Sequence, residues 1–159
     1  MEDLSNYEKL KEDAQRLYAQ TGKVFSSAFN QEIFFTSEGF NHIIFKSSRT
    51  ERERSSQILR FKLIPLAIKL LKISTTYQEF EETLKEFEVK SHKERVKKTK
   101  IVRYWGIIAI IDNRKIKVIV RKIGEEGKMH FWSIVPAWVT NIYIDTKLFT
   151  TMKGNPEED

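Results

Sequence analysis

The sequence predicts an α+β domain in which helices come first and an antiparallel sheet of about four strands comes second. Up to Lys90, apolar residues recur at helical spacing, whereas after Lys90 the chain is rich in β-branched and aromatic residues separated by turn sequences. Composition is that of a globular domain, with 40% hydrophobic and 31% charged residues. We expect one domain over residues 1–152, with helices packed on the sheet, and a frayed polar tail over residues 153–159.

The helical half is predicted from capping boxes, in which a Ser or Thr precedes a Glu by three residues. Boxes at Ser5–Glu8, Thr50–Glu53 and Thr76–Glu79 lie where a helix is consistent with the residues that follow. Apolar residues follow each box at helical spacing, so we expect helices from Ser5, from Glu51 and from Thr76. Pro65 is expected to kink the second helix or to start a new one, with a buried helix over residues 66–73.

The strands are predicted from β-branched runs bounded by turns. Residues 32–36 indicate a short strand, and residues 37–45 a turn that leads into an apolar piece. An antiparallel meander follows, with strands over residues 100–111, 116–123 and 129–135. The fourth strand is either residues 32–36 or a piece near Ile142. Alternation within the second meander strand points Lys117 and Arg121 to one face, which we expect to be open and basic.

Charge favours a polyanionic partner. The chain has a net charge of +6 and a pI near 9.4, and lysines and arginines bind phosphates with release of counterions. The charge is also segregated: residues 77–88 hold five acids and one base, and residues 89–104 hold seven bases and one acid. This pattern is typical of a protein with one basic functional face. The absence of cysteine and of any long apolar run predicts a cytoplasmic protein with no membrane partner.

Several site types are absent from the sequence. None of the six glycines has the spacing of a phosphate-binding loop, and the three histidines are far apart. Carboxylates do not cluster on the predicted strands as a two-metal nuclease requires. We therefore expect neither a metal nor an organic cofactor. The remaining chemistry is acid–base catalysis by histidine beside cations, which suits RNA because RNA supplies its own 2′-hydroxyl nucleophile.

The predicted catalytic residues lie in three places: just before the cationic segment 49–62, within that segment, and on the predicted strands. His42 is the first candidate for the proton-transfer group; its alternative is a half-buried histidine bonded to a backbone carbonyl. The remaining members are Arg60 and Arg103 for the phosphate, and His130 or Ser133 for the second proton transfer or hydrogen bond.

A second set is predicted to bind nucleic acid through charge and base stacking. A purely structural interpretation is also possible. In it the basic residues form a solvated helix face paired with Glu51 and Glu53, and the tryptophans belong to the core. Residues 92–100 are expected to form a loop or strand entry that steers polyanions. The members of the set are Lys46, Arg49, Arg52, Lys62, Trp105, Lys117, Arg121 and Trp132.

Residues 33–68 resemble the phage-associated nucleases of the Barnase–EndoU–colicin–RelE group. The match consists of a short strand, the pair His42-Ile43, and a basic helix with Arg49 and Arg60 that runs to Pro65. Residues 130–136 (HFWSIVP) resemble the last core strand of that group. The resemblance implies a RelE/barnase-like fold and metal-independent RNA cleavage that leaves a cyclic phosphate, in a phage or toxin setting with a cognate inhibitor. A second histidine soon after the first, which members often keep, is absent here.

Three functions therefore stay open. The first is a metal-independent endoribonuclease. The second is a non-catalytic nucleic-acid-binding module that uses the same basic face. The third is a phage or mobile-element protein-interaction domain whose charge serves solubility.

Overall fold

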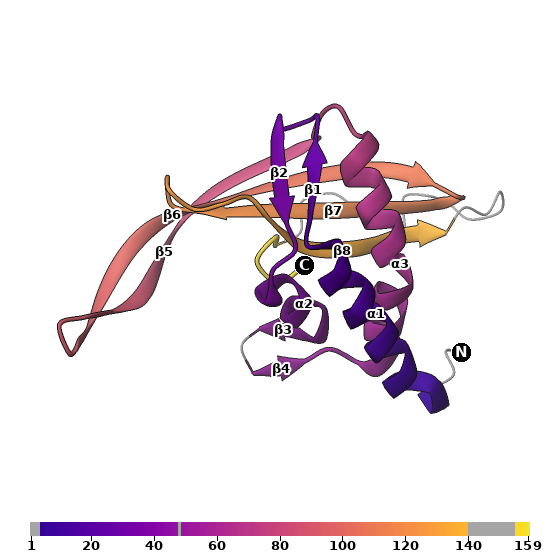
Figure 1. Ribbon diagram of the computed structural model, residues 1–159, viewed down its shortest axis with the longest axis horizontal. Helices are drawn as coiled ribbons and strands as arrows, with labels where there is room; N and C mark the ends of the chain where they lie inside the picture. Colours follow the sequence, from indigo (N-terminus) through magenta and orange to yellow (C-terminus); the bar gives the residue numbers. More distant parts are fainter. Residues whose placement is uncertain (1–3, 48, 140–154) are drawn as a thin grey trace.

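The computed structural model describes residues 4–47, 49–139 and 155–159 (Figure 1). In this part of the chain three α-helices pack beside a mixed six-stranded sheet, which confirms the α+β class. A 3-10 turn at Leu4–Asn6 precedes the helices α1 (Tyr7–Thr21), α2 (Ser37–Ile44) and α3 (Arg54–Ile73). The strands are β1 (Lys23–Ser26), β2 (Gln31–Phe34), β3 (Phe45–Ser47), β4 (Thr50–Glu51), β5 (Glu79–Ser91), β6 (Glu94–Ile111), β7 (Arg114–Ile123) and β8 (His130–Val139). No helix of the described residues is long and apolar enough to cross a membrane.

The main sheet has the strand order β1-β2-β8-β7-β6-β5, and β3 and β4 form a separate pair. It is larger than the predicted four-stranded antiparallel sheet because β5 and the β1–β2 hairpin join the predicted meander. The strands β5 to β8 are antiparallel neighbours, whereas β2 and β8 run parallel and pair only at Phe34 and His130. The alternative fourth strand near Ile142 lies outside the described residues.

The third predicted helix is wrong, because residues 79–91 form the edge strand β5. Two of its five acidic residues lie directly opposite basic residues of β6. Glu82 lies opposite Arg103 and bonds to it at 3.0 Å, and Glu88 lies opposite Lys97 and also pairs with Arg95 at 3.4 Å. Cross-strand pairing with residues 94–106 of β6 therefore overrides the helical spacing of the apolar residues. Part of the charge segregation along the sequence serves this pairing rather than one basic face.

Two other helices also differ from the sequence prediction. Residues 37–44 form α2 where a turn was predicted. The helix α3 begins at Arg54 with Glu53 as its N-cap, and it continues through Pro65 as one element of 20 residues. Because α3 starts late, Arg49 and Arg52 precede it and do not share a helix side with Arg60.

The helix α2 is held closely against β8 by a glycine. A β-carbon on Gly39 would lie 2.4 Å from both the Phe131 carbonyl oxygen and the Tyr18 hydroxyl. That hydroxyl donates a hydrogen bond of 2.6 Å to the carbonyl of Thr36, just before α2. Beyond His130, β2 no longer pairs with β8, and residues of α2 and α3 contact β8 there. This junction places the polar residues described below.

We predict that Gly39→Ala lowers the free energy of unfolding by about 1–3 kcal/mol, because the methyl group overpacks the contact between α2 and β8. Urea unfolding of the purified variant measures the change. Asn41→Ala, at an exposed position of the same helix, is the control and should shift stability by less than about 0.5 kcal/mol. Equal stability of the Gly39 variant and wild type would show that the contact is loose.

Candidate functional site

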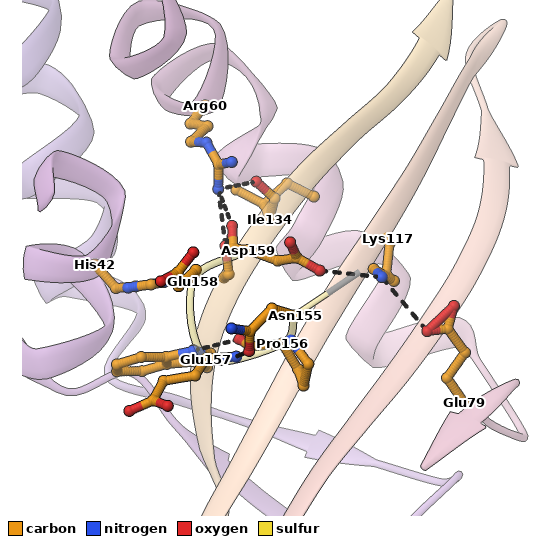
Figure 2. A network of polar contacts seen from close by, with 12 residues as sticks. His42, Arg60, Glu79, Lys117, Ile134, Asn155, Pro156, Glu157, Glu158 and Asp159 are labelled. Atoms are coloured by element: carbon orange, nitrogen blue, oxygen red, sulfur yellow. Dashed lines mark hydrogen bonds and ion pairs between the residues drawn. The ribbon is translucent and has the colours of Figure 1, made fainter. Parts of the chain in front are cut away.

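The polar residues of interest gather on one face of β7 and β8. Lys117, Ile119 and Arg121 lie on this face, as alternation predicted, while Val118 and Val120 belong to the helix-covered core. The face is not open, however, since Lys117 and Arg121 are each only 4% exposed. Residues 155–159 lie against it (Figure 2). The prediction of an open face is therefore wrong, and so is the prediction of a frayed tail for residues 155–159.

An irregularity in β8 brings two neighbouring residues to this face. Ser133 pairs with Ile119 and Phe131 pairs with Val120, so Trp132 is an extra residue in the register. Trp132 packs with Tyr104 and Ile119 on the same face as Ser133. The strict alternation assumed from the sequence does not place adjacent side chains together in this way.

Trp132 carries a cation and a histidine on its ring. The Arg121 guanidinium carbon lies 3.6 Å from the ring centre, and the His42 ring stacks at a centroid distance of 4.0 Å with an interplanar angle of 14°. Two groups this close to one ring centre occupy opposite ring faces. Trp132 is therefore not free to stack on a nucleic-acid base, the role predicted from the sequence, unless one of these neighbours leaves.

His42 is held as a neutral ring among arginines. Arg52 donates from Nε to the His42 carbonyl oxygen at 3.0 Å, and its Nη2 lies 3.2 Å from His42 Nε2. Because a guanidinium only donates, Nε2 accepts this hydrogen bond. Burial, followed by the charges of Arg52, Arg60 and Arg121, lowers the pKa of His42 to about 3. His42 is thus uncharged at neutral pH and has an acceptor nitrogen.

His130 positions Arg121. Arg121 Nε donates to His130 Nε2 at 2.8 Å, and His130 Nδ1 lies 3.1 Å from the carbonyl oxygen of Lys128. Burial and the Arg121 charge lower the pKa of His130. Arg121 also bonds to Glu38 at 2.5 Å. Both ring nitrogens of His130 are engaged, so this histidine holds an arginine in place rather than facing a substrate.

Arg60 reaches from α3 to the unpaired edge of β8. Its Nη1 donates to Ser133 Oγ at 2.9 Å and to the Ile134 carbonyl oxygen at 3.1 Å. Its buried Nε has no hydrogen-bond partner in the described part of the chain. Burial, followed by the charge of Arg52, lowers the pKa of Arg60 to about 9, so it remains charged at neutral pH. Nη1 also donates to the main-chain oxygen of Asp159 at 2.6 Å, so this buried cation already binds an oxygen acceptor from residues 155–159.

The remaining predicted residues lie apart from this cluster. Arg103 pairs with Lys122 across β6 and β7, whereas Tyr104 pairs with Arg121, so Arg103 lies on the opposite face. There it bonds to Glu82 and Glu125. Trp105, on the same face as Arg103, packs against Phe29 and Phe80. Arg49 and Lys62 are exposed, on the β3–β4 turn and on α3.

The structure thus brings His42, Arg60, His130 and Ser133 together and leaves Arg103 outside. Comparison with protein-family models, curated proteins and solved structures gives no match. No group of three potential metal ligands occurs among the described residues. Sequence reasoning missed Glu38, Lys85 and the acidic residues 157–159. Residues 157–159 could have been found from the sequence, because three successive acids stand out in a strongly basic chain.

Beside the cluster lies an open groove of about 630 Å³. His42 and Trp132 form its inner wall, and Lys46 and Lys85 stand at its sides. Glu157 and Glu158 also line it. With Glu38 included, the lining holds three glutamates and two lysines and no arginine. His42 and Trp132 in this lining contact the half-buried Arg52 and the buried Arg121.

We predict that folding stability falls as the pH falls from about 6.5 toward 3. In this range the unfolded chain protonates His42, whose ordinary pKa is 6.5, while the folded protein keeps it neutral. The loss is at most about 1.4 kcal/mol for each pH unit from this residue. Urea unfolding between pH 7 and pH 4 measures it. His42→Gln should show a shallower dependence, and an unchanged slope would contradict the assignment.

Proposed function

We propose that this protein is a metal-independent endoribonuclease whose site lies at the junction of α2, α3 and β8. The observation that carries the proposal is the convergence of a neutral histidine, His42, with Arg52, Arg60 and the hydroxyl of Ser133. A histidine acceptor beside guanidiniums is the set that cleavage of RNA by its own 2′-hydroxyl requires.

Each group has a role in this proposal. His42 takes the proton of the 2′-hydroxyl at Nε2 as the hydroxyl oxygen attacks the phosphorus. Arg52 Nη2, which donates to that nitrogen in the free protein, turns to the phosphate first. The bond to the 5′-oxygen breaks, and the product is a 2′,3′-cyclic phosphate. Arg52 and Arg60 bind the phosphate oxygens and stabilise the developing negative charge. Ser133 is the hydroxyl placed to donate a hydrogen bond to the leaving 5′-oxygen. That oxygen takes its proton from water, and His42 releases the proton that it accepted to solvent.

The low pKa of His42 makes it a weak base in the free protein. Guanidinium charges contribute to that low pKa, and a bound phosphodiester introduces an opposing negative charge near them. Substrate binding therefore raises the pKa of His42 and strengthens it as a base. This coupling restricts proton transfer to the complex with RNA.

A RelE/barnase-like fold is part of the same proposal. The strands β5 to β8 form an antiparallel run of four, and HFWSIVP lies on β8 as the resemblance implies. The β1–β2 hairpin, which pairs with β8 through a parallel contact, is then an addition to that core.

A non-catalytic RNA-binding module is the second candidate. The observation that favours it is again the low pKa of His42, together with the engagement of His130 by Arg121 and Lys128. Such a module would use the same arginines to hold phosphates, without proton transfer.

The β5–β6 hairpin provides a path for RNA toward the site. Figure 1 shows its far end projecting beyond the helices. Residues paired across a hairpin share a face, and the pairing places a basic set with an aromatic residue on the site's side, between Glu94 at the hairpin turn and Glu81 at the other end of the set. This set consists of Lys85, Phe87, Lys98 and Lys100. On the opposite face, bases are mixed with acids: Glu86, Glu88, Lys90, Arg95 and Lys97.

We predict RNA cleavage in the presence of EDTA, with fragments that end in cyclic phosphate. His42→Gln should lower the cleavage rate by about 100-fold or more, because it removes the general base. His92→Gln, in the exposed β5–β6 turn, is the matched control and should keep the wild-type rate. Binding of intact RNA without products would favour the second candidate, and cleavage undiminished in the His42 variant would remove its role.

We also predict that the double variant Lys98→Gln with Lys100→Gln binds single-stranded RNA less tightly and with a smaller salt dependence than wild type. The double variant Lys90→Gln with Lys97→Gln removes the same charge from the other face of the hairpin and is the control. Fluorescence anisotropy over a salt series measures both. Equal losses in the two variants would show that only net charge matters.

A further inference from the structure

The acidic residues 155–159 contact the same groups that would bind RNA phosphates (Figure 2). The main-chain oxygen of Asp159 accepts hydrogen bonds from Arg60 at 2.6 Å, Ser133 at 2.8 Å and Arg52 at 3.2 Å. Its side chain pairs with Lys117 at 3.5 Å. One oxygen atom thus occupies the position between the two arginines and the serine where the proposed function requires a phosphate oxygen.

The other acidic residues of this segment line the groove and pair with its two lysines. Glu158 pairs with Lys46 at 3.7 Å, and Glu157 pairs with Lys85. Between them and the sheet, Trp132 Nε1 donates to the Pro156 carbonyl oxygen at 2.9 Å. The segment therefore presents a row of oxygen acceptors and negative charges to a row of donors and positive charges, as a short polyanion would.

These outer contacts are of a kind that a stronger anion displaces. The side chains of Glu157 and Glu158 remain 45% and 48% exposed, so water and salt screen their ion pairs. An RNA strand carries a charge on every phosphate and gains from the release of counterions. Competition for the same donors is then decided by the concentration and length of the RNA.

We propose that residues 155–159 are an internal competitor that occupies the RNA-binding site and leaves when RNA binds. The inference rests on the proposed function and adds its regulation. The protein is then held in a closed state, and the apparent affinity for RNA equals the intrinsic affinity multiplied by the fraction of molecules whose segment is released.

The test compares three full-length proteins for binding to a fluorescein-labelled single-stranded RNA. The tail variant carries Glu157→Gln, Glu158→Gln and Asp159→Asn. The control carries Glu12→Gln, Asp13→Asn and Glu32→Gln at exposed positions of α1 and β2, so that both raise the net charge by the same amount. The tail variant should bind about tenfold more tightly than wild type, and the control should gain much less.

A second measurement does not depend on the stability of the variant. In the wild-type protein, RNA should shift the NMR signal of the Trp132 indole N–H, because that group loses its Pro156 acceptor. Equal affinity of wild type and tail variant, or weaker binding by the tail variant, would overturn the inference while leaving the proposed function intact. Absence of RNA binding by all three proteins would overturn the proposed function and the inference together.

Discussion

Positive charge buried beside β8 is the constraint on which the rest of the site depends. The incomplete pairing of β2 with β8 leaves an edge that α3 covers with Arg60, and the irregularity at Trp132 places Arg121 against an aromatic ring. A buried guanidinium must find acceptors, because burial without them is costly. Glu38 serves Arg121, but Arg60 depends on neutral oxygens and on Asp159. The cluster therefore favours an anion. Residues 155–159 occupy it in the structure, and a phosphate of the proposed RNA substrate would satisfy the same charge imbalance.

The same imbalance sets the chemistry of His42. Burial against Trp132, followed by the charges of the surrounding guanidiniums, lowers the pKa of His42, so the ring stays neutral at pH values well below its usual pKa. An anion placed among these cations weakens the effect of their charges, so anion binding and the basicity of His42 are coupled. In the proposed reaction this coupling links recognition of a phosphate to activation of the base. His130, with both ring nitrogens bonded to its neighbours, has a positioning role in the same proposal.

Local pattern predicted the parts of this structure that local rules control. Alternation placed Lys117 and Arg121 on one face, and residue chemistry selected His42, Arg60 and Ser133, which lie close together although they are distant in sequence. Local pattern failed where pairing between segments distant in sequence determines the structure. Residues 79–91 have helical spacing but become a strand because β6 requires an edge partner, and Arg103 is directed away from the site by its register with Lys122. An extra residue in β8 and an acidic segment that folds back on the sheet have no periodic signal at all.

Photo-crosslinking of single-stranded RNA that carries 4-thiouridine tests the central claim most directly, because it reports which face of the sheet RNA contacts. We predict crosslinks in peptides from α2 and β3, from the part of β8 around Trp132, and from Phe87 on the hairpin. Excess unlabelled RNA should abolish them. Crosslinks confined to the opposite face, at Phe80 and Trp105, would contradict the assignment of this cluster as the site.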